Sequence, residues 1–272
     1  MGLRINTNVA SLNTARILNR STNALNKSLQ RLSSGLRINS AADDAAGLAI
    51  AEGFRSVVSG TQVAARNAQD GVSLVQTAEG ALSETTNILQ RIRELAVQAA
   101  NGTQSTDNRS ALNNEVQQLL TQIDSIASDT AFNGIPVLSA AQTLTLQSGA
   151  QQGQTLLVTM TGAKTNDLGI NTVSVSSVAV AVSTITTIDT ALKSVNSLRG
   201  SLGAFQNRLE FTINTLAIQE ENSSAAQSAI RDANIATETI SFTRNQILVS
   251  AGTSILAQAN VLPQTALTLL GR

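Results

Sequence analysis

Apolar side chains recur at helical spacing near both ends of the chain. In the N-terminal segment they lie three, four or seven positions apart, which is the period of one helix face. These positions are Leu18, Leu25, Leu29, Leu32 and Leu36. A second stripe of this kind, near the C-terminus, consists of Ile240, Ile247, Ala251, Ile255, Ala259, Leu262 and Ala266. Neither stripe has a partner within its own segment, so we expect the two end helices to pair. Surface left over by that pairing is expected to contact other copies of the chain.

Proline, the strongest helix breaker, occurs only at Pro136 and Pro263, which predicts long helices. The first helix is predicted over 4–36, and the second from Asp44 to about Asn101. Residues 39–44 are predicted to supply a cap for the second helix, with the carboxylates of Asp43 and Asp44 at the positive end of its dipole. The heptad seams of this helix are Phe54, Thr61, Ala68, Val75, Leu82, Leu89 and Ala96, and Val57, Ala64, Gly71, Ala78, Thr85, Ile92 and Ala99. Four glycines interrupt its first half, and each costs about 1 kcal/mol against alanine. We therefore expect this helix to need lateral support.

The pattern changes in the middle of the chain. A third helix is predicted from about residue 105, followed by a turn at 133–136. Residues 143–147 and 155–160 then alternate as strands do, as do residues 173–182, which predicts a small β element at about 138–182. Helical periodicity returns at Ile188 and runs to about Arg231, and a terminal helix follows to Leu270. The predicted fold class is mainly α: a long antiparallel helical bundle or coiled-coil rod with paired terminal helices and a small β-hairpin insert.

The composition narrows the chemistry. The chain has five Phe and no Trp or Tyr, so apolar burial must come from aliphatic residues, which suits closely packed helices. It has no His and no Cys, which excludes a Ser-His-Asp triad, a cysteine nucleophile, an imidazole or thiolate metal site and a disulfide. No carboxylate cluster has ligand spacing, and no glycine-rich phosphate loop is present. We therefore expect no enzyme activity, no cofactor and no metal.

Charge is balanced overall, with 18 basic and 18 acidic residues, but residues 1–42 carry six basic residues and no acid. These bases are scattered among Asn and Ser without aromatic residues, which favours a solvated or inter-subunit helix face over a nucleic-acid or membrane surface. Residues 1–20 contain no apolar signal core, and the run 178–182 is too short to span a bilayer. We expect no membrane insertion. Both a cytoplasmic protein and one exported without a cleaved signal fit this composition.

Longer motifs give the chain a family resemblance. They are INTNVASLNT at 5–14, LSSGLRINSAADDAAGLAIAE at 32–52, RNAQDGVSLVQTAEGAL at 66–82, LQRIRELAVQAANGT at 89–103, FNG at 132–134 and LLGR at 269–272. Together they cover nearly the whole chain outside about 140–185, and several are long and specific. On these residues the chain resembles a bacterial flagellin of the short kind.

The resemblance implies two domains. Residues 1–42 and 233–272 would form the terminal-helix domain that lines the inner tube of a filament, and residues 43–232 a rod-like shell domain with the β insert. Larger family members carry outer domains, which the short insert here leaves out. The inner-tube assembly seam would then consist of Leu18, Leu25, Leu29, Leu32, Leu36, Ile247, Ile255 and Leu262.

The resemblance also implies function, location and partners. The chain would be a structural subunit that self-polymerises into the extracellular flagellar filament, serves motility and is exported without a cleaved signal. An interface between different faces of identical copies yields a helical filament when its rotation does not close. Further implied partners are an export chaperone at the C-terminal helix, the hook-associated junction and cap proteins, and a host innate receptor.

The receptor expectation concerns residues 90–98. By spacing alone, Gln90, Arg91, Glu94 and Leu95, with Glu115 on the following helix, form an ordinary helix surface in which each ion pair contributes a few tenths of a kcal/mol. Flagellins with the motif QRxRELAVQ, which residues 90–98 match, are detected by the flagellin-sensing Toll-like receptor. The resemblance implies that Arg91 and Leu95 are principal contacts and Glu115 a supporting one.

Two alternatives remain at this point. A hook–filament junction protein would share the terminal helices, but the match over 66–103 argues against it. A cytoplasmic coiled-coil scaffold would form a stable monomer or dimer and no filaments.

Overall fold

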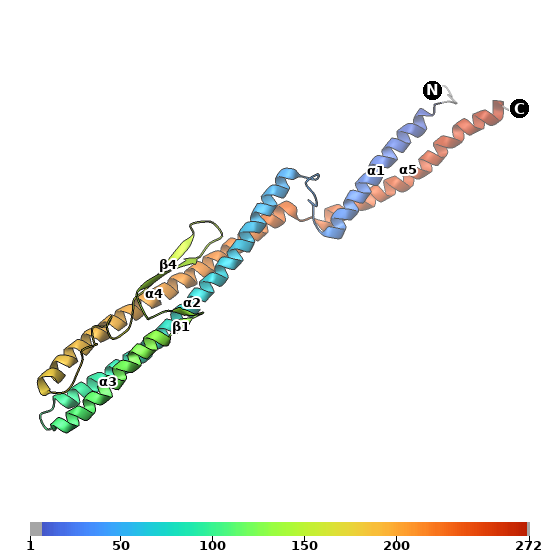
Figure 1. Cartoon of the computed structure of the whole chain (residues 1–272). Helices are drawn as coiled ribbons and strands as arrows, with labels where there is room; N and C mark the ends of the chain where they lie inside the picture. Colours follow the sequence, from blue (N-terminus) through green and yellow to red (C-terminus); the bar gives the residue numbers. More distant parts are fainter. Residues whose placement is uncertain (1–6, 271–272) are drawn as a thin grey trace. The chain divides into compact units, whose positions relative to one another are not determined.

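The computed structural model describes the backbone of residues 7–270 and the side chains of residues 7–261. In this range the mainly α class with a small hairpin is confirmed (Figure 1). The predicted helix start at position 4 and the LLGR motif extend outside the described residues. The elements in order are α1 (Val9–Ser34), α2 (Ala45–Ala100), α3 (Thr106–Asp129), β1 (Ala131–Phe132), β2 (Ile135–Pro136), β3 (Gln142–Gln147), β4 (Thr155–Met160), α4 (Val178–Arg231) and α5 (Ile235–Leu270).

Local caps set the helix ends. Asn8 Oδ1 accepts a hydrogen bond from the Ser11 amide at 3.1 Å, and Gly35 ends α1 in the left-handed region at φ 71°. Asp44 Oδ1 accepts from the Gly47 amide at 2.9 Å, so the predicted cap of α2 is confirmed.

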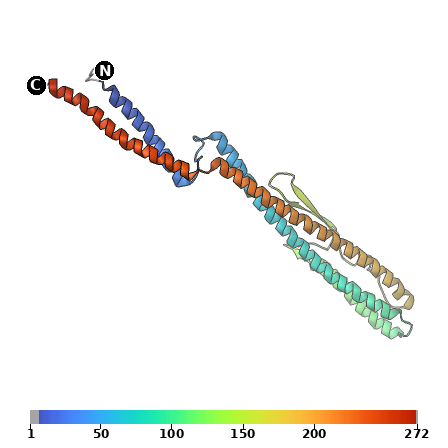
Figure 2. The ribbon, with the colours of Figure 1, turned by 180° about the vertical axis from the view of Figure 1, so that it is seen from behind.

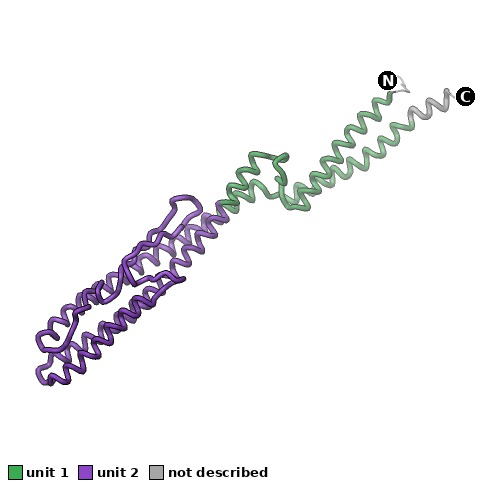
Figure 3. Tube along the Cα trace, viewed as in Figure 1, with its two compact units in different colours: residues 1–56, 222–272 green, residues 57–221 purple. Residues whose placement is uncertain are grey.

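The chain divides into two compact units: unit 1 is residues 1–56 with 222–272, and unit 2 is residues 57–221 (Figure 3). The helix breaks at 35–44 and 232–234 lie close to the predicted domain boundaries, whereas the compact units divide inside α2 and α4. The division at 42/43 and 232/233 stays a prediction.

In unit 1, α1 and α5 lie side by side and antiparallel (Figures 1 and 2). Hydrogen bonds join the start of α1 to the C-terminal part of α5, where Asn8 Nδ2 donates to the Ala259 carbonyl at 2.8 Å. At the other end of the pair, the Ala233 amide donates to the Gly35 carbonyl at 2.9 Å. The two end helices of the chain therefore pair, as the stripes predicted.

In unit 2, α2 and α4 run antiparallel and build the core. Every predicted seam residue of α2 from Thr61 to Ala99 is buried. Ile188, Val195, Leu202 and Leu209 of α4 are buried opposite them. An ion pair between Arg93 Nε and Asp189 Oδ1 at 2.7 Å marks the antiparallel register.

The hairpin β3–β4 supplies the lateral support that α2 was expected to need. Its strands pair from Gln142↔Met160 to Gln147↔Thr155. A methyl group on Gly60 would lie 2.8 Å from Ala150 Cβ, and one on Gly71 would lie 2.8 Å from Leu146 Cδ1. Two of the interrupting glycines therefore admit the hairpin to the surface of α2.

The extended segment predicted over 173–182 is partly wrong, because α4 already begins at Val178. Ser177 Oγ accepts from the Val180 amide, and the Ser177 carbonyl accepts from Ala181. Burial of Ala181, Thr184 and Ile188 follows a helical spacing of three and four, which outweighs the β propensity of alternating valines.

The irregular segment 161–177 lies along α3. Asp124 accepts hydrogen bonds from the backbone amide and hydroxyl of Thr165, and Asn113 Oδ1 accepts from the Val175 amide at 3.0 Å. Gln117, which lies between Asn113 and Asp124 on α3, donates from its Nε2 to the Val173 carbonyl at 2.9 Å.

Candidate functional site

The face that α1 and α5 share is built from half-buried aliphatic and small residues. Leu18 sits against Gly252, where an added methyl group would come within 3.2 Å of Leu18 Cδ1. On the α1 side the half-buried or buried residues also include Ser21, Leu25, Ser28 and Leu32, and on the α5 side Phe242, Val249 and Leu256. Arg31 and Glu238 form an ion pair at 3.6 Å across the helices. Leu36 follows α1 and makes a backbone bridge to Asp232.

Three positions of the predicted assembly seam lie outside the contact between α1 and α5, and their role in assembly stays a prediction. Leu29, Ile247 and Ile255 are 54%, 62% and 57% exposed, on the sides of their helices that face away from the partner. Helix α5 carries aliphatic residues around much of its circumference, so periodicity alone could not tell the inner face from the outer one. The heptad Phe242, Val249 and Leu256, with Gly252 opposite Leu18, was the available signal. Leu262 lies outside the described side chains.

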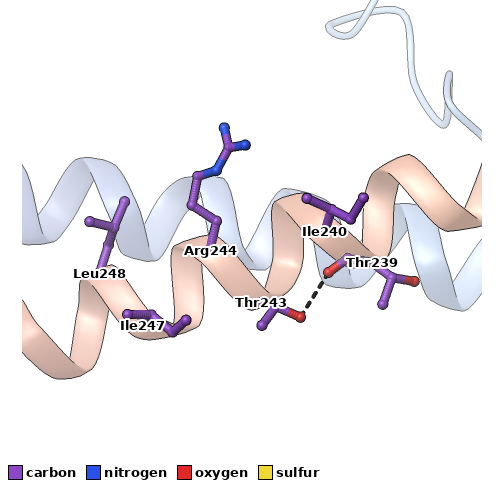
Figure 4. Close-up of a pocket in the computed structure, with 6 residues that line it drawn as sticks. All are labelled: Thr239, Ile240, Thr243, Arg244, Ile247 and Leu248. Carbon is purple, nitrogen blue, oxygen red and sulfur yellow. Dashed lines mark hydrogen bonds between the residues drawn. The ribbon is translucent and has the colours of Figure 1, made fainter.

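The outer faces of this pair form an exposed apolar surface. A shallow hollow on α5 is lined by Thr239, Ile240, Thr243, Arg244, Ile247 and Leu248 (Figure 4). The Thr243 hydroxyl donates to the Thr239 carbonyl at 2.9 Å, so the hollow presents aliphatic groups beside the guanidinium of Arg244. On α1, Val9, Leu12 and Ile17 are likewise more than half exposed. Aliphatic surface gathered on one region of a protein indicates an interaction site.

The second candidate site lies in unit 2, where α2 and α3 run antiparallel. Arg91 Nε and Nη2 donate to Glu115 Oε1 at 3.1 and 2.9 Å, and Arg91 Nη1 donates to Glu94 Oε2 at 3.2 Å. The hydrogen bonds to Glu115, and then the one to Glu94, raise the pKa of the Arg91 guanidinium above its usual range. Gln90 is exposed beside them. The structure thus gathers four of the five receptor-face residues on the surface.

Leu95 is the exception. Its side chain is 1% exposed and belongs to the core of unit 2. The direct-contact role implied for Leu95 is therefore wrong for this conformation. A motif match carries residue types but not the depth at which a side chain lies. The available signal was the position of Leu95, three residues after Ile92 and four before Ala99 of the predicted seam.

Two further features of the described residues are possible metal sites and possible membrane-spanning helices. Within the described residues, no group of three or more carboxylates is placed to hold a metal ion. Helix α4 has the length and hydropathy of a membrane-spanning helix, but its seam residues Ile188, Val195 and Leu202 are buried in the core of unit 2.

The fold and the exposed faces place the chain in a general class of protein, namely helical proteins whose terminal helices pair and carry an exposed apolar surface. A family model described as the bacterial flagellin N-terminal helical region matches residues 5–143. A second, described as the bacterial flagellin C-terminal helical region, matches residues 185–270. The chain belongs to the bacterial flagellin family, a family of structural proteins that polymerise into the filament of the bacterial flagellum.

Relatives that match over nearly their whole length are also flagellins or flagellar filament proteins. The chain is 46% identical over 271 residues to a flagellin of Halalkalibacterium halodurans, covering 98% of this chain and 99% of that one. It is 44% identical over 283 residues to the flagellar filament 31.3 kDa core protein of Treponema maltophilum, again covering 98% and 99%. A solved structure titled as a putative flagellar hook-associated protein from Vibrio parahaemolyticus superposes with a TM-score of 0.59 over 70% of this chain and all of that one. At 14% identity it shares the fold alone, so it gives no support to the junction-protein alternative.

Proposed function

We propose that this chain polymerises into an extracellular flagellar filament through the outward apolar faces of α1 and α5. The observation that carries the proposal is the set of large aliphatic side chains on those faces, among them Ile240, Ile247 and Ile255. Side chains of this kind gain free energy when a neighbouring copy covers them, about 1.5–3 kcal/mol for each one fully buried. The filament serves motility as part of the flagellum, and the chain has a structural and no catalytic role in it.

The remaining expectations belong to the same proposal. Export proceeds without a cleaved signal. An export chaperone holds the C-terminal helix before assembly, covering aliphatic surface that would otherwise associate early. Junction and cap proteins with similar paired helices contact the two ends of the filament.

The test compares polymerisation of the full chain with that of Ile240→Ser/Ile247→Ser. Loss of two isoleucines that a neighbouring copy would cover raises the concentration needed for assembly at least about tenfold. Negative-stain electron microscopy and pelleting after seeding measure it, beside a chain lacking residues 1–40 and 233–272, for which we expect no filaments.

Gln246→Ser provides the matched control, because Gln246 is exposed on the same helix and polar. Circular dichroism checks that helix content is kept. Unchanged assembly by the double variant would remove these faces from the interface. A full chain that stayed a monomer or dimer under every condition would favour the scaffold alternative.

A second proposal concerns the free subunit: the flagellin-sensing Toll-like receptor binds the face formed by Gln90, Arg91, Glu94 and Glu115. The exposed guanidinium of Arg91, fixed by two carboxylates, supports it. Arg91→Gln should weaken receptor binding, measured by surface plasmon resonance with monomers. Arg93→Gln is the control, since Arg93 pairs with Asp189 on α4. Equal loss of binding in both variants would refute a specific role of this face.

A further inference from the structure

The turn between α2 and α3, at one end of unit 2, contains the dipeptide Asn101-Gly102 (Figure 3). Both residues are exposed to solvent. An asparagine side chain is open to attack by the next backbone nitrogen in the chain, and glycine permits the approach best because it has no Cβ. The dipeptide is therefore a reactive point, and the hydrogen bonds around it determine how reactive it is.

The backbone carbonyl of Asn101 accepts two hydrogen bonds. Arg109 Nη2 donates to it at 3.1 Å, and the Gln104 amide donates at 3.2 Å. Arg109 Nε bonds at the same time to the Ala99 carbonyl at 3.0 Å, which fixes the guanidinium in place. These donors, one of them positively charged, stabilise the negative charge that the peptide group acquires when the Gly102 nitrogen loses its proton.

The Asn101 side chain folds back over the same peptide group. Its Oδ1 accepts a hydrogen bond from the Thr103 amide at 3.2 Å. The ring of atoms that this bond closes includes both Asn101 Cγ and the Gly102 nitrogen. The Thr103 amide also lies on the oxygen that becomes negative when this nitrogen attacks Cγ. Within the described residues the Gly102 amide has no acceptor, so base in the solvent can remove its proton.

We propose that unit 2 promotes the deamidation of its own Asn101. The Gly102 nitrogen, deprotonated by solvent base, bonds to Asn101 Cγ. The bond from Cγ to Nδ2 then breaks, and the leaving nitrogen takes a proton from water and departs as ammonia. Water opens the resulting five-membered succinimide ring at either of its two carbonyls. The product is aspartate, or isoaspartate, in which the main chain runs through the former side chain.

Both products change the end of α2. A new carboxylate stands at the C-terminal end of the helix, where the dipole disfavours negative charge. Isoaspartate also lengthens the connection between α2 and α3 by one methylene group. Arg109, which already lies at this turn, is the cation in place to pair with the new charge. Each subunit therefore accumulates a chemical mark with time after it folds.

A second Asn-Gly pair, Asn133-Gly134, provides a reference within the same chain. It forms the two-residue turn between β1 and β2, with φ of 50° at Asn133 and 78° at Gly134. In the part of the chain that the structure describes, no protein group donates to the side chain or the carbonyl of Asn133. Closing the succinimide ring there also means leaving the left-handed conformations on which this turn depends. We expect Asn133 to react more slowly than Asn101.

Peptide mass spectrometry of the full chain tests the proposal, after incubation in mildly alkaline buffer, folded or unfolded in urea. Fragmentation by electron transfer separates aspartate from isoaspartate. In the folded chain we expect Asn101 to convert severalfold faster than Asn133, whereas in urea the two should convert at similar rates. Slower conversion of Asn101 in the folded chain than in urea would overturn the proposal, because the fold would then protect this turn.

Variants separate promotion of the reaction from ordinary stabilisation of the turn. Arg109→Gln should slow conversion of Asn101 severalfold, with Arg66→Gln as the control, since Arg66 is exposed on α2 and makes no ion pair within the described residues. Faster conversion in Arg109→Gln would overturn the proposal, because the guanidinium would then only hold the turn closed. Gly102→Ala should nearly abolish conversion without disturbing the fold, since an added methyl group there meets no atom within 4 Å.

Discussion

At the scale of single residues, the glycines of α2 have different roles. Gly60 and Gly71 stand where the β3–β4 hairpin approaches the helix, and an added methyl group would overlap with Ala150 or Leu146. Gly80, on the same helix, has open space around it. Helix propensity treats the three alike, so only the position of a neighbour distinguishes them.

Replacing Gly60 with alanine should therefore destabilise unit 2 by about 1–3 kcal/mol, the typical cost of overpacking. The overlap is with the backbone and Cβ of Ala150, which no side-chain rotation relieves. Gly80→Ala should instead stabilise by about 0.5–1 kcal/mol. Urea unfolding followed by circular dichroism measures both. Equal stabilisation by the two substitutions would mean that the hairpin is not seated on Gly60.

At the scale of elements, the connection between α1 and α2 depends on one carboxylate. Asp43 Oδ1 pairs with Lys27 Nζ at 2.8 Å, and Asp43 Oδ2 accepts from the amides of Asn39 and Ser40. The hydrogen bond from Lys27, followed by those backbone bonds, lowers the pKa of Asp43 from 3.8 to about 2.

A lowered pKa in the folded state makes stability depend on pH. The contribution of Asp43 is fully present above its unfolded pKa of 3.8 and is lost as the pH falls through about 2. Exchange at the Asn39 and Ser40 amides should accelerate between these pH values, after correction for the intrinsic rate. In Asp43→Asn this acceleration should disappear. The same pH profile in the variant would show that another group controls the connection.

Much of the element structure could be predicted from the sequence, and the failures have specific causes. The α2 heptad from Thr61 onward and the cap at Asp44 were right, because burial follows a strict period there and the cap is local. The alternation at 178–182 led to a wrong prediction of extended structure there. The same valines fit a helix, because Ala181 then faces the core. For Ile247, the sequence could not say which of several apolar positions on its helix meets a partner inside the chain. For Leu95, the family motif was followed although the spacing from Ile92 and Ala99 indicated burial.

At the scale of the whole molecule, the two units have very unequal cores. Among the described side chains, the buried apolar residues of unit 1 are Ile38 and Ala51, whereas unit 2 buries long seams of Leu, Ile and Val. Free energy from apolar burial grows with the area removed from water. Unit 1 therefore depends on contacts that the isolated chain supplies only in part.

We expect thermal unfolding of the free chain to proceed in two steps, with unit 1 melting first. Circular dichroism should show an early, shallow loss of helix and then a cooperative transition of unit 2. Assembly into filaments should abolish the early step, because neighbouring copies cover the exposed faces. A single cooperative transition in the free chain would indicate that the units stabilise each other.

The hydrogen bonds along α3 have a consequence for how the chain can vary. Asp124 holds Thr165, and Gln117 holds Val173, so two fixed points on a rigid helix set the span that the chain between them must cover. Helix positions advance by about 1.5 Å per residue and cannot stretch to follow an insertion. Residues 166, 167, 171 and 172 face solvent and are free to change in kind. The number of residues between the two fixed points is constrained, because α3 sets the distance that they must span. This segment should therefore tolerate substitutions and not a deletion.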